Sequence, residues 1–150
     1  AIADNLIPFI RGEEEKVVGE TRKILKADFE IYATTTRVNV VDGHTEVVYV
    51  DTRRDFDVSA VADVLERFRG PPQELKLPTA PERPIEVRRQ ADRPQPRLDR
   101  MAGRGMAVVV GRIRRLAPRK LSFIVLGHNT IRGAAGNSIL TAELMAAQSR

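Results

Sequence analysis

Apolar side chains recur at helical spacing between Val17 and Leu25, and three glutamates, at residues 13–15, come just before them. Acidic side chains suit the positive end of a helix dipole, and the basic residues that close this stretch suit the negative end. The pattern predicts a helix from about Glu13 to Lys26.

The next pattern predicts a β-hairpin. Residues 29–41 are rich in β-branched side chains and partly alternate, Asp42-Gly43 is a favoured turn dipeptide, and residues 44–51 alternate again. With a two-residue loop, the strand period of two would place Arg37 and His44 on one face of the sheet. Both side chains could then serve one pocket.

Turn and breaker residues divide the remainder of the chain. Asp57 can cap a helix that Gly70 and the following Pro71-Pro72 should end. Seven prolines forbid a continuous helix between residues 71 and 100, but apolar anchors along this stretch predict an ordered meander with a short edge strand at residues 85–88. Strands at residues 106–113 and 121–126 and a final helix at about 133–148 complete the pattern.

This order of elements predicts an α+β fold in which a mixed or antiparallel sheet carries helices on one face. The other face of such a sheet is left free. We therefore expect it to form a homodimer or tetramer surface, and we expect residues 1–150 to form one domain.

Composition narrows the class of protein. The 150 residues are 42% hydrophobic and 30% charged, and no apolar run approaches the ~20 residues that span a bilayer. The first residues lack the basic start and apolar core of a signal peptide, so we expect a cytoplasmic protein without a membrane partner. There is no cysteine and there are two histidines, which excludes a thiol nucleophile within this chain and does not favour a metal site.

The net charge of +5 comes mostly from arginines, many of them between Arg83 and Arg119. A basic stripe can attract nucleic acid, so a basic nucleic-acid-binding module is one alternative function. Single-strand binders interleave aromatic rings with such charges, however, and only Phe123 lies near these arginines. We therefore favour an arginine-rich surface or an oligomer interface, and a purely structural dimerisation module remains a further alternative.

Three places could carry chemistry. Arg37 stands in an otherwise apolar predicted strand and should face a carboxylate, either of Glu30 or Glu46 or of a substrate that its planar fork would hold. His44 is either a surface histidine or a proton shuttle, and the residue types alone favour the structural alternative for both side chains. Glu13 and Lys16 form either a surface pair or a site for one small polar ligand. We interpret His128 as structural.

A glycine-rich stretch near the end of the chain joins a predicted strand to a predicted helix. It reads FIVLGHNTIRGAAGNSILTAEL over residues 123–144, an order that suits a cofactor-facing junction. Its glycines do not complete the dinucleotide-binding fingerprint, so alone it is a weak signal.

Together with other segments, this stretch resembles the C-terminal half of archaeal- and fungal-type aspartate-semialdehyde dehydrogenases. The resembling segments lie at residues 4–16, 36–46, 77–81, 93–100, 105–113 and 128–136. The resemblance implies a fold similar to the C-terminal domain of glyceraldehyde-3-phosphate-dehydrogenase-like enzymes. It also implies that the nucleotide-binding half, with the cysteine nucleophile, lies outside this chain and that residues 133–148 pack on it.

The resemblance assigns roles to the candidate residues. Arg37 would hold the substrate carboxylate, Glu13 the substrate amine, and Lys16 would lie near the phosphate site. His44 would be the catalytic acid-base residue, and Asn129 would lie near the nicotinamide of the cofactor. No metal is implied.

The activity implied is NADP-dependent interconversion of aspartyl phosphate and aspartate semialdehyde, a step of lysine, threonine and methionine biosynthesis. In this family a thiolate attacks the aldehyde, hydride passes to NADP and phosphate releases the acyl group, so this chain alone should be inactive. The residues that distinguish NADP from NAD lie outside it. A malonyl-CoA or succinyl-CoA reductase of the same fold is the rival, and Glu13 favours the aspartate enzyme because only its substrate carries an amine.

Overall fold

The first helix begins where the glutamate run predicts it. The computed structural model describes residues 2–149, and its backbone divides into a first unit that ends at Val41 and a second that begins at Asp42. Helix α1 (Glu13–Leu25) belongs to the first unit, has its three glutamates in the first turn, and is capped by Lys26 at its C-terminal end. The predicted helix is confirmed.

The predicted hairpin is wrong. Residues 29–41 contain no continuous strand, and Arg37 forms only an isolated antiparallel bridge with Ile7. Strand β1 (His44–Asp51) pairs instead with β4 (Lys120–Gly127), in antiparallel register along its whole length. Because β4 buries Leu121 and Leu126, it offers β1 an apolar neighbour, and this distant pairing outweighs the local turn signal.

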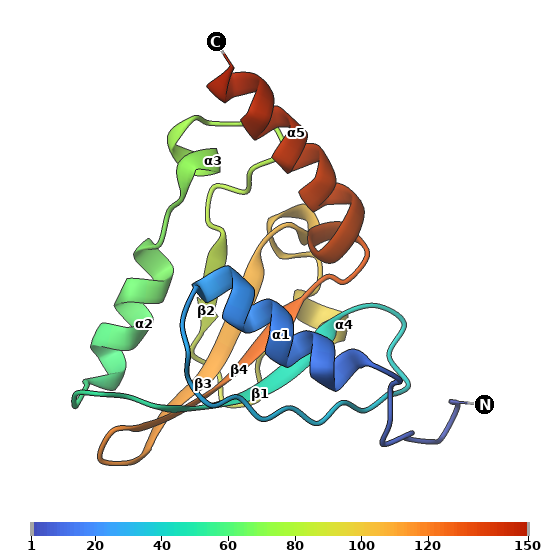
Figure 1. Cartoon of the computed structure of the whole chain (residues 1–150), viewed down its shortest axis with the longest axis vertical. Helices are drawn as coiled ribbons and strands as arrows, with labels where there is room; N and C mark the ends of the chain where they lie inside the picture. The colour runs from blue at the N-terminus through green and yellow to red at the C-terminus, as the bar shows by residue number, and fades with distance from the viewer. Residues whose placement is uncertain (1, 150) are drawn as a thin grey trace. The chain divides into compact units, whose positions relative to one another are not determined.

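Four strands of the second unit form one mixed sheet in the order β1, β4, β3, β2 (Figure 1). Strands β3 (Val108–Ala117) and β4 are antiparallel, and β2 (Ile85–Arg88) runs parallel to β3 at the sheet edge opposite β1. The predicted α+β class, the mixed sheet and the edge strand at residues 85–88 are confirmed.

Helix α2 (Val58–Arg67) begins at the predicted cap. The Asp57 carboxylate accepts a hydrogen bond from the Ala60 N–H at 3.0 Å, which satisfies one of the donors that every helix start leaves without a partner. Pro71 and Pro72 do not simply end helical structure, because they occupy the first turn of a short helix, α3 (Pro71–Glu74). Proline suits that place, where a backbone N–H would have no intrahelical acceptor.

The proline-rich meander is ordered, as predicted. After α3 and β2 it contains a second short helix, α4 (Pro96–Asp99), and a 3-10 turn, η1 (Ala102–Gly105), before β3 begins. Beyond β4 the chain makes a π-helical turn, η2 (Ile131–Ala135), and continues directly into α5 (Gly136–Gln148). The predicted last helix therefore agrees with α5 to within three residues at its start.

Helix α5 packs on the meander of the second unit. Leu140 is buried against Leu77 and Met106, and the Glu143 carboxylate accepts hydrogen bonds from the N–H and the hydroxyl of Thr79 at 3.0 and 2.7 Å. That residues 133–148 also pack on a nucleotide-binding domain stays a prediction. None of the helices among residues 2–149 combines the length and apolar character needed to cross a bilayer.

Candidate functional site

His44 is the first residue of β1, and its side chain is exposed. It lies opposite Gly127, the last residue of β4. Glycine has no side chain that could cover the histidine from the neighbouring strand. The imidazole therefore stands accessible at the end of the β1–β4 pair.

Gly43, the residue before His44, has a backbone conformation and surroundings that require glycine. Its φ of 117° is one that residues with side chains rarely adopt, and a Cβ at this position would lie 3.2 Å from Leu126 Cδ1 and 3.3 Å from Pro96 Cβ. The glycine of the predicted turn thus serves a different purpose: it lets the backbone approach the sheet and α4 closely just before His44.

A side chain that follows the end of β4 holds this backbone. The Asn129 Oδ1 atom accepts a hydrogen bond from the Gly43 N–H at 2.8 Å. Asn129 lies two residues beyond the end of β4, and its side chain is partly buried. The resemblance predicts that Asn129 lies near the cofactor. The hydrogen bond to Gly43, next to the candidate acid-base residue, is one that residue patterns do not reveal.

A buried carboxylate fixes the segment that packs on Gly43. Pro96 begins α4, and Asp99 ends it. Asp99 is 1% exposed and accepts hydrogen bonds from Arg93 Nε at 2.6 Å, from Arg88 Nε at 3.0 Å and from a backbone N–H of the same segment at 2.8 Å. Burial by itself would raise the pKa of Asp99, but these hydrogen bonds, that of Arg93 foremost, lower it to about 2. Asp99 is therefore ionised at neutral pH.

Several arginines of the basic stretch are engaged with carboxylates in the same way. Arg89 lies 3.3 Å from a carboxylate oxygen of Glu66, and Arg115 lies 2.6 Å from Asp55 and 4.8 Å from the ring centroid of Phe56. These exposed pairs are weak. Arg88 and Arg93, which share the buried Asp99, are the arginines of the stretch that are less free to bind phosphates, and they support a structural role for this part of it.

Glu13 and Lys16 form an ion pair in the first unit. Lys16 Nζ lies 3.3 Å from Glu13 Oε1, and the side chains are 52% and 34% exposed, respectively. The pair is worth little to stability because both groups remain hydrated. It is therefore free to open for a ligand that offers each group a better partner.

Hydrogen bonds within the first unit fix the backbone around Arg37, and the side chain of Arg37 is exposed. The Arg37 N–H donates to the Ile7 carbonyl at 2.8 Å, and the Thr35 N–H donates to Glu14 Oε1 at 2.8 Å. The Arg37 side chain is exposed, and within the described part of the first unit it forms no ion pair with Glu30 or another carboxylate. The expected pairing with Glu30 is therefore not found.

The structure groups the predicted residues by unit. Glu13, Lys16 and Arg37 belong to the first unit, and His44 and Asn129 belong to the second. In the second unit, His44 follows Gly43 in the sequence and Asn129 is hydrogen-bonded to Gly43. The hairpin argument that placed Arg37 and His44 on one face is wrong, so their joint action belongs to the proposed function. Among residues 2–149, no three histidine, cysteine, aspartate or glutamate side chains are placed to hold a metal ion.

His128 serves the turn after β4. Its side chain is buried, and Nδ1 lies 3.2 Å from the hydroxyl of Thr130 and 3.4 Å from the backbone nitrogen of Ile131. Its carbonyl accepts a hydrogen bond from the Gly133 N–H at 3.0 Å. These contacts support the structural interpretation of His128.

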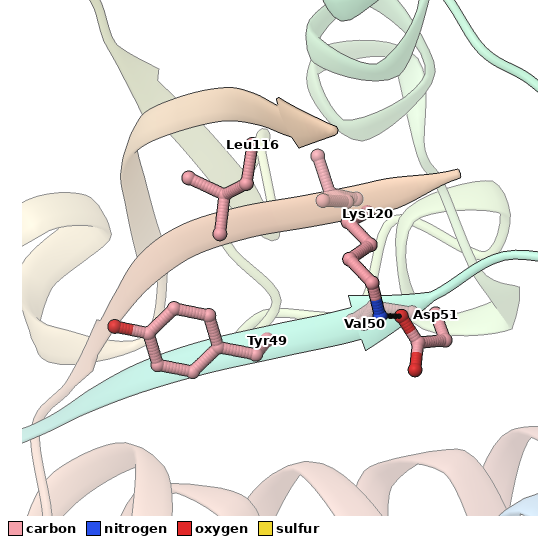
Figure 2. A pocket seen from close by; sticks show the side chains of 6 residues that line it. Tyr49, Val50, Asp51, Leu116 and Lys120 are labelled. Atoms are coloured by element: carbon pink, nitrogen blue, oxygen red, sulfur yellow. Dashed lines mark hydrogen bonds and ion pairs between the residues drawn. The ribbon is translucent and has the colours of Figure 1, made fainter. Parts of the chain in front are cut away.

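A hollow of about 210 Å³ lies at the opposite end of β1 from His44. Figure 2 shows Tyr49 and Leu116 beside it and the ion pair of Asp51 with Lys120 at 2.6 Å. Ligand pockets commonly measure about 300–1,000 Å³, and none of the predicted site residues lines this hollow. We therefore do not assign it to the substrate.

Comparison with known proteins extends over nearly the whole chain. Residues 1–132 match the family model of the semialdehyde dehydrogenase dimerisation domain. Aspartate-semialdehyde dehydrogenases of Methanothermobacter thermautotrophicus and Archaeoglobus fulgidus are 50% and 53% identical to the chain over 97% of its length. The matched regions are 45% and 44% of the lengths of these two enzymes. A malonyl CoA reductase (NADP) of Metallosphaera sedula is 46% identical over 96% of this chain and 44% of its own length.

Solved structures agree with these matches. An aspartate-semialdehyde dehydrogenase with NADP from Candida albicans superposes with a TM-score of 0.88 at 39% identity, covering 99% of this chain and 46% of that one. Aspartate semialdehyde dehydrogenase II complexed with ASA from Vibrio cholerae gives 0.81 at 33% identity, covering 97% and 42%. Fold and matches together define a dimerisation domain of the semialdehyde dehydrogenase class. The chain belongs to this family and corresponds to the C-terminal domain of its aspartate-semialdehyde dehydrogenases.

Proposed function

We propose that this chain is the substrate-binding and dimerisation half of an NADP-dependent enzyme that interconverts aspartyl phosphate and aspartate semialdehyde. The observation that carries the proposal is the 50% and 53% identity to two aspartate-semialdehyde dehydrogenases over 97% of the chain. The chain spans about 45% of the length of such a relative. The complete enzyme therefore means this chain together with the nucleotide-binding half that its relatives carry.

Arg37 is the proposed partner of the substrate carboxylate. Its backbone is tied to Ile7 by two hydrogen bonds, at 2.8 and 3.0 Å, while none of the carboxylates among residues 2–41 engages its exposed guanidinium. A planar guanidinium can donate two parallel hydrogen bonds to one carboxylate, which fixes the orientation of the bound molecule as well as its position. Such orientation lowers the entropic part of the reaction barrier.

Glu13 and Lys16 are the proposed partners of the substrate amine and of phosphate. Their weak ion pair at 3.3 Å places a negative and a positive group side by side at the start of α1. The ammonium group of the substrate would pair with Glu13, and a separate phosphate anion would pair with Lys16. Opening the pair costs little because both groups are partly hydrated.

His44 is the proposed acid-base residue. Its imidazole is exposed at the end of β1, where a substrate can reach it, while Gly43 and Asn129 hold the backbone behind it. Histidine changes charge close to neutral pH, so it can accept and return a proton during one turnover.

Of the predicted site residues in this chain, Asn129 is the one proposed to contact NADP, and the other half of the enzyme would bind the rest of the cofactor. NADP supplies the acceptor or donor of hydride when it is bound. Asn129 retains an amide nitrogen that can donate a hydrogen bond toward the nicotinamide, because its oxygen is occupied by the Gly43 N–H. The nucleophilic cysteine must come from the other half of the enzyme, since this chain has none.

A malonyl-CoA or succinyl-CoA reductase is the second candidate. The 46% identity to a malonyl CoA reductase supports it almost as strongly as the matches to aspartate enzymes support the first. Glu13 favours the aspartate enzyme, because a carboxylate stabilises an ammonium group, and a malonyl or succinyl group carries no ammonium group for it to bind.

We further propose that the enzyme is cytoplasmic and forms homodimers or tetramers through this domain. The match to a dimerisation-domain family supports the assembly. Exposed apolar side chains on the sheet, among them Val47 and Tyr49 of β1, support it as well, because such a surface is stabilised when a second copy covers it.

The test is an assay of the complete enzyme with aspartate semialdehyde, in which phosphate and CoA, and NADP and NAD, are compared. We expect turnover that depends on phosphate and NADP. Turnover that needs CoA and ignores phosphate would select the reductase instead. This chain alone should form dimers at micromolar concentration without dehydrogenase activity, and oxidation of aspartate semialdehyde by the chain alone would contradict the proposal.

A further inference from the structure

The hydrogen bond between Asn129 and Gly43 joins residues 86 positions apart. A backbone N–H can only donate, so the atom of Asn129 that faces Gly43 must be its oxygen, and the amide nitrogen is left for another partner. The two ends of this side chain can therefore have separate tasks, and a substitution can remove one and keep the other.

This bond continues the attachment of β1 beyond its regular pairing. The β1–β4 ladder ends with His44 opposite Gly127, and the bonded N–H belongs to the next residue along, Gly43. Strand ends open more easily than strand centres, because fewer contacts hold them. Asn129 supplies a hydrogen bond at the end of β1 where His44 would otherwise be free to shift.

The other contacts at Gly43 limit its position but do not orient it. Leu126 and Pro96 approach so closely that a Cβ would lie 3.2 and 3.3 Å from them, and these contacts are apolar. Apolar contacts are not directional, whereas a hydrogen bond weakens steeply as its angle departs from linear. Asn129 therefore sets the orientation of the Asp42–Gly43 peptide, one residue before His44.

We propose that Asn129 is a positioning residue for His44, because its side-chain oxygen holds the Gly43 N–H and with it the backbone that carries the imidazole. The inference rests on the proposed function, in which His44 moves a proton. It differs from contact with the nicotinamide in the atom used: positioning needs the oxygen as an acceptor, and cofactor contact needs the nitrogen as a donor.

The experiment compares Asn129→Ala and Asn129→Asp in the complete enzyme. Alanine removes acceptor and donor, and we expect kcat to fall on the order of 10- to 100-fold, the size of effect that small misplacement of a catalytic group causes. Any change in KM for NADP should be the same in both variants, because both lose the donor. Aspartate keeps an acceptor and loses the donor, so it should recover most of the lost kcat. Gln90→Ala, which removes an exposed amide from the turn after β2, is the matched control and should have no effect.

Two further measurements separate positioning from general damage. Amide hydrogen exchange should be faster at Gly43 in Asn129→Ala than in wild type, and near wild type in Asn129→Asp, because only alanine lacks an acceptor for that N–H. In a His44→Asn background, Asn129→Ala should lower kcat less than about twofold further, because residues that act through one another are not additive.

Some results would overturn the inference and leave the proposed function intact. These are an Asn129→Ala enzyme with unchanged kcat and Gly43 exchange while His44→Asn is impaired, equal losses of kcat in the Ala and Asp variants, or fully multiplicative losses in the double variant. An unchanged kcat in the single variant His44→Asn would instead refute the role proposed for His44. The positioning role of Asn129 would then be refuted too, because it depends on that role.

Discussion

Arg93 contacts both carboxylate oxygens of Asp99, through Nε to Oδ2 at 2.6 Å and through a terminal guanidinium nitrogen to Oδ1. The backbone of Arg93 also lies very close to Gly111 of β3: a Cβ on Gly111 would be 2.4 Å from the Arg93 carbonyl oxygen. The close approach requires glycine at position 111. Side chain and main chain of Arg93 together attach the meander to the sheet.

We expect Asp99→Asn to destabilise the fold by about 3–5 kcal/mol, because it leaves two partly buried guanidinium groups without their shared carboxylate. Urea unfolding followed by circular dichroism measures the change. Asp63→Asn is the matched control: Asp63 is 51% exposed and lies 3.9 and 4.0 Å from its arginine partners, so its loss should cost less than about 1 kcal/mol. Equal losses in the two variants would contradict the importance of the buried pair.

The same carboxylate predicts a dependence of stability on pH. The pKa of Asp99 is lowered from 3.8 to about 2 in the folded state, so its ionised form stabilises the fold above pH ~4, and this stabilisation is lost as the pH falls from about 4 to about 2. The contribution is about 2 kcal/mol. Between pH 6 and pH 2, the difference in unfolding free energy between wild type and Asp99→Asn should narrow by about 2 kcal/mol. A constant difference would show that Asp99 does not titrate as described.

Gly43→Ala should destabilise the protein by about 1–3 kcal/mol, because alanine rarely adopts a φ of 117° and its Cβ would crowd Leu126 and Pro96. Gly19→Ala is the contrasting control. Gly19 lies inside α1 with no atom within 4 Å of an added Cβ, so alanine should stabilise the helix by up to about 1 kcal/mol. Thermal melts that show the same sign for both variants would refute this difference.

Arg37→Lys in the complete enzyme should raise KM for aspartate semialdehyde and lower kcat/KM, because a point charge replaces a two-pronged contact with the carboxylate. Folding should be nearly unchanged, since the contacts of Arg37 that the first unit provides are made by its backbone. Arg53→Lys, at an exposed position after β1, is the control for arginine replacement. Kinetics of Arg37→Lys within about twofold of wild type would leave Arg37 without a role in binding.

His44→Asn should lower kcat by a factor on the order of 10² to 10⁴ and change KM little, as expected when an acid-base group is removed. Glu46→Gln, two residues further along the same strand, should retain kcat. Steady-state kinetics from pH 5 to 9 measure both effects. If kcat and its pH profile were the same in His44→Asn as in wild type, His44 would be a surface histidine.

Local patterns predict the helices and the sheet strands of this chain well. The three acidic residues that open α1 and the Asp57 cap of α2 act through neighbours within one helical turn, so their effect is readable from a short stretch of sequence. The β3 and β4 strands are long and apolar, and a two-residue loop joins them. Their pairing is likewise predictable.

Pairing between distant segments is what the patterns miss. Asp42-Gly43 predicts a turn between adjacent strands, but β1 pairs with β4, and the last residue of β1, Asp51, already lies 69 positions before its partner Lys120. The resemblance predicts that Asn129 lies near the cofactor, and nothing in the local sequence links it to Gly43. Asp99 has no visible partner in sequence, because Arg88 and Arg93 meet it only after the meander folds on the sheet.

The β1–β4 pair is anchored at both ends, since Lys120 meets Asp51 at 2.6 Å at the end opposite Gly43 and Asn129. A slip of one residue would exchange the two faces of β1 and turn its half-buried residues, Val48 and Val50, outward. A slip of two would keep the faces but move His44 by about 7 Å along the sheet and break both anchors. The location of the imidazole is thus a property of the register of the whole β1–β4 ladder, to which the exposed Asp51–Lys120 pair adds only weakly.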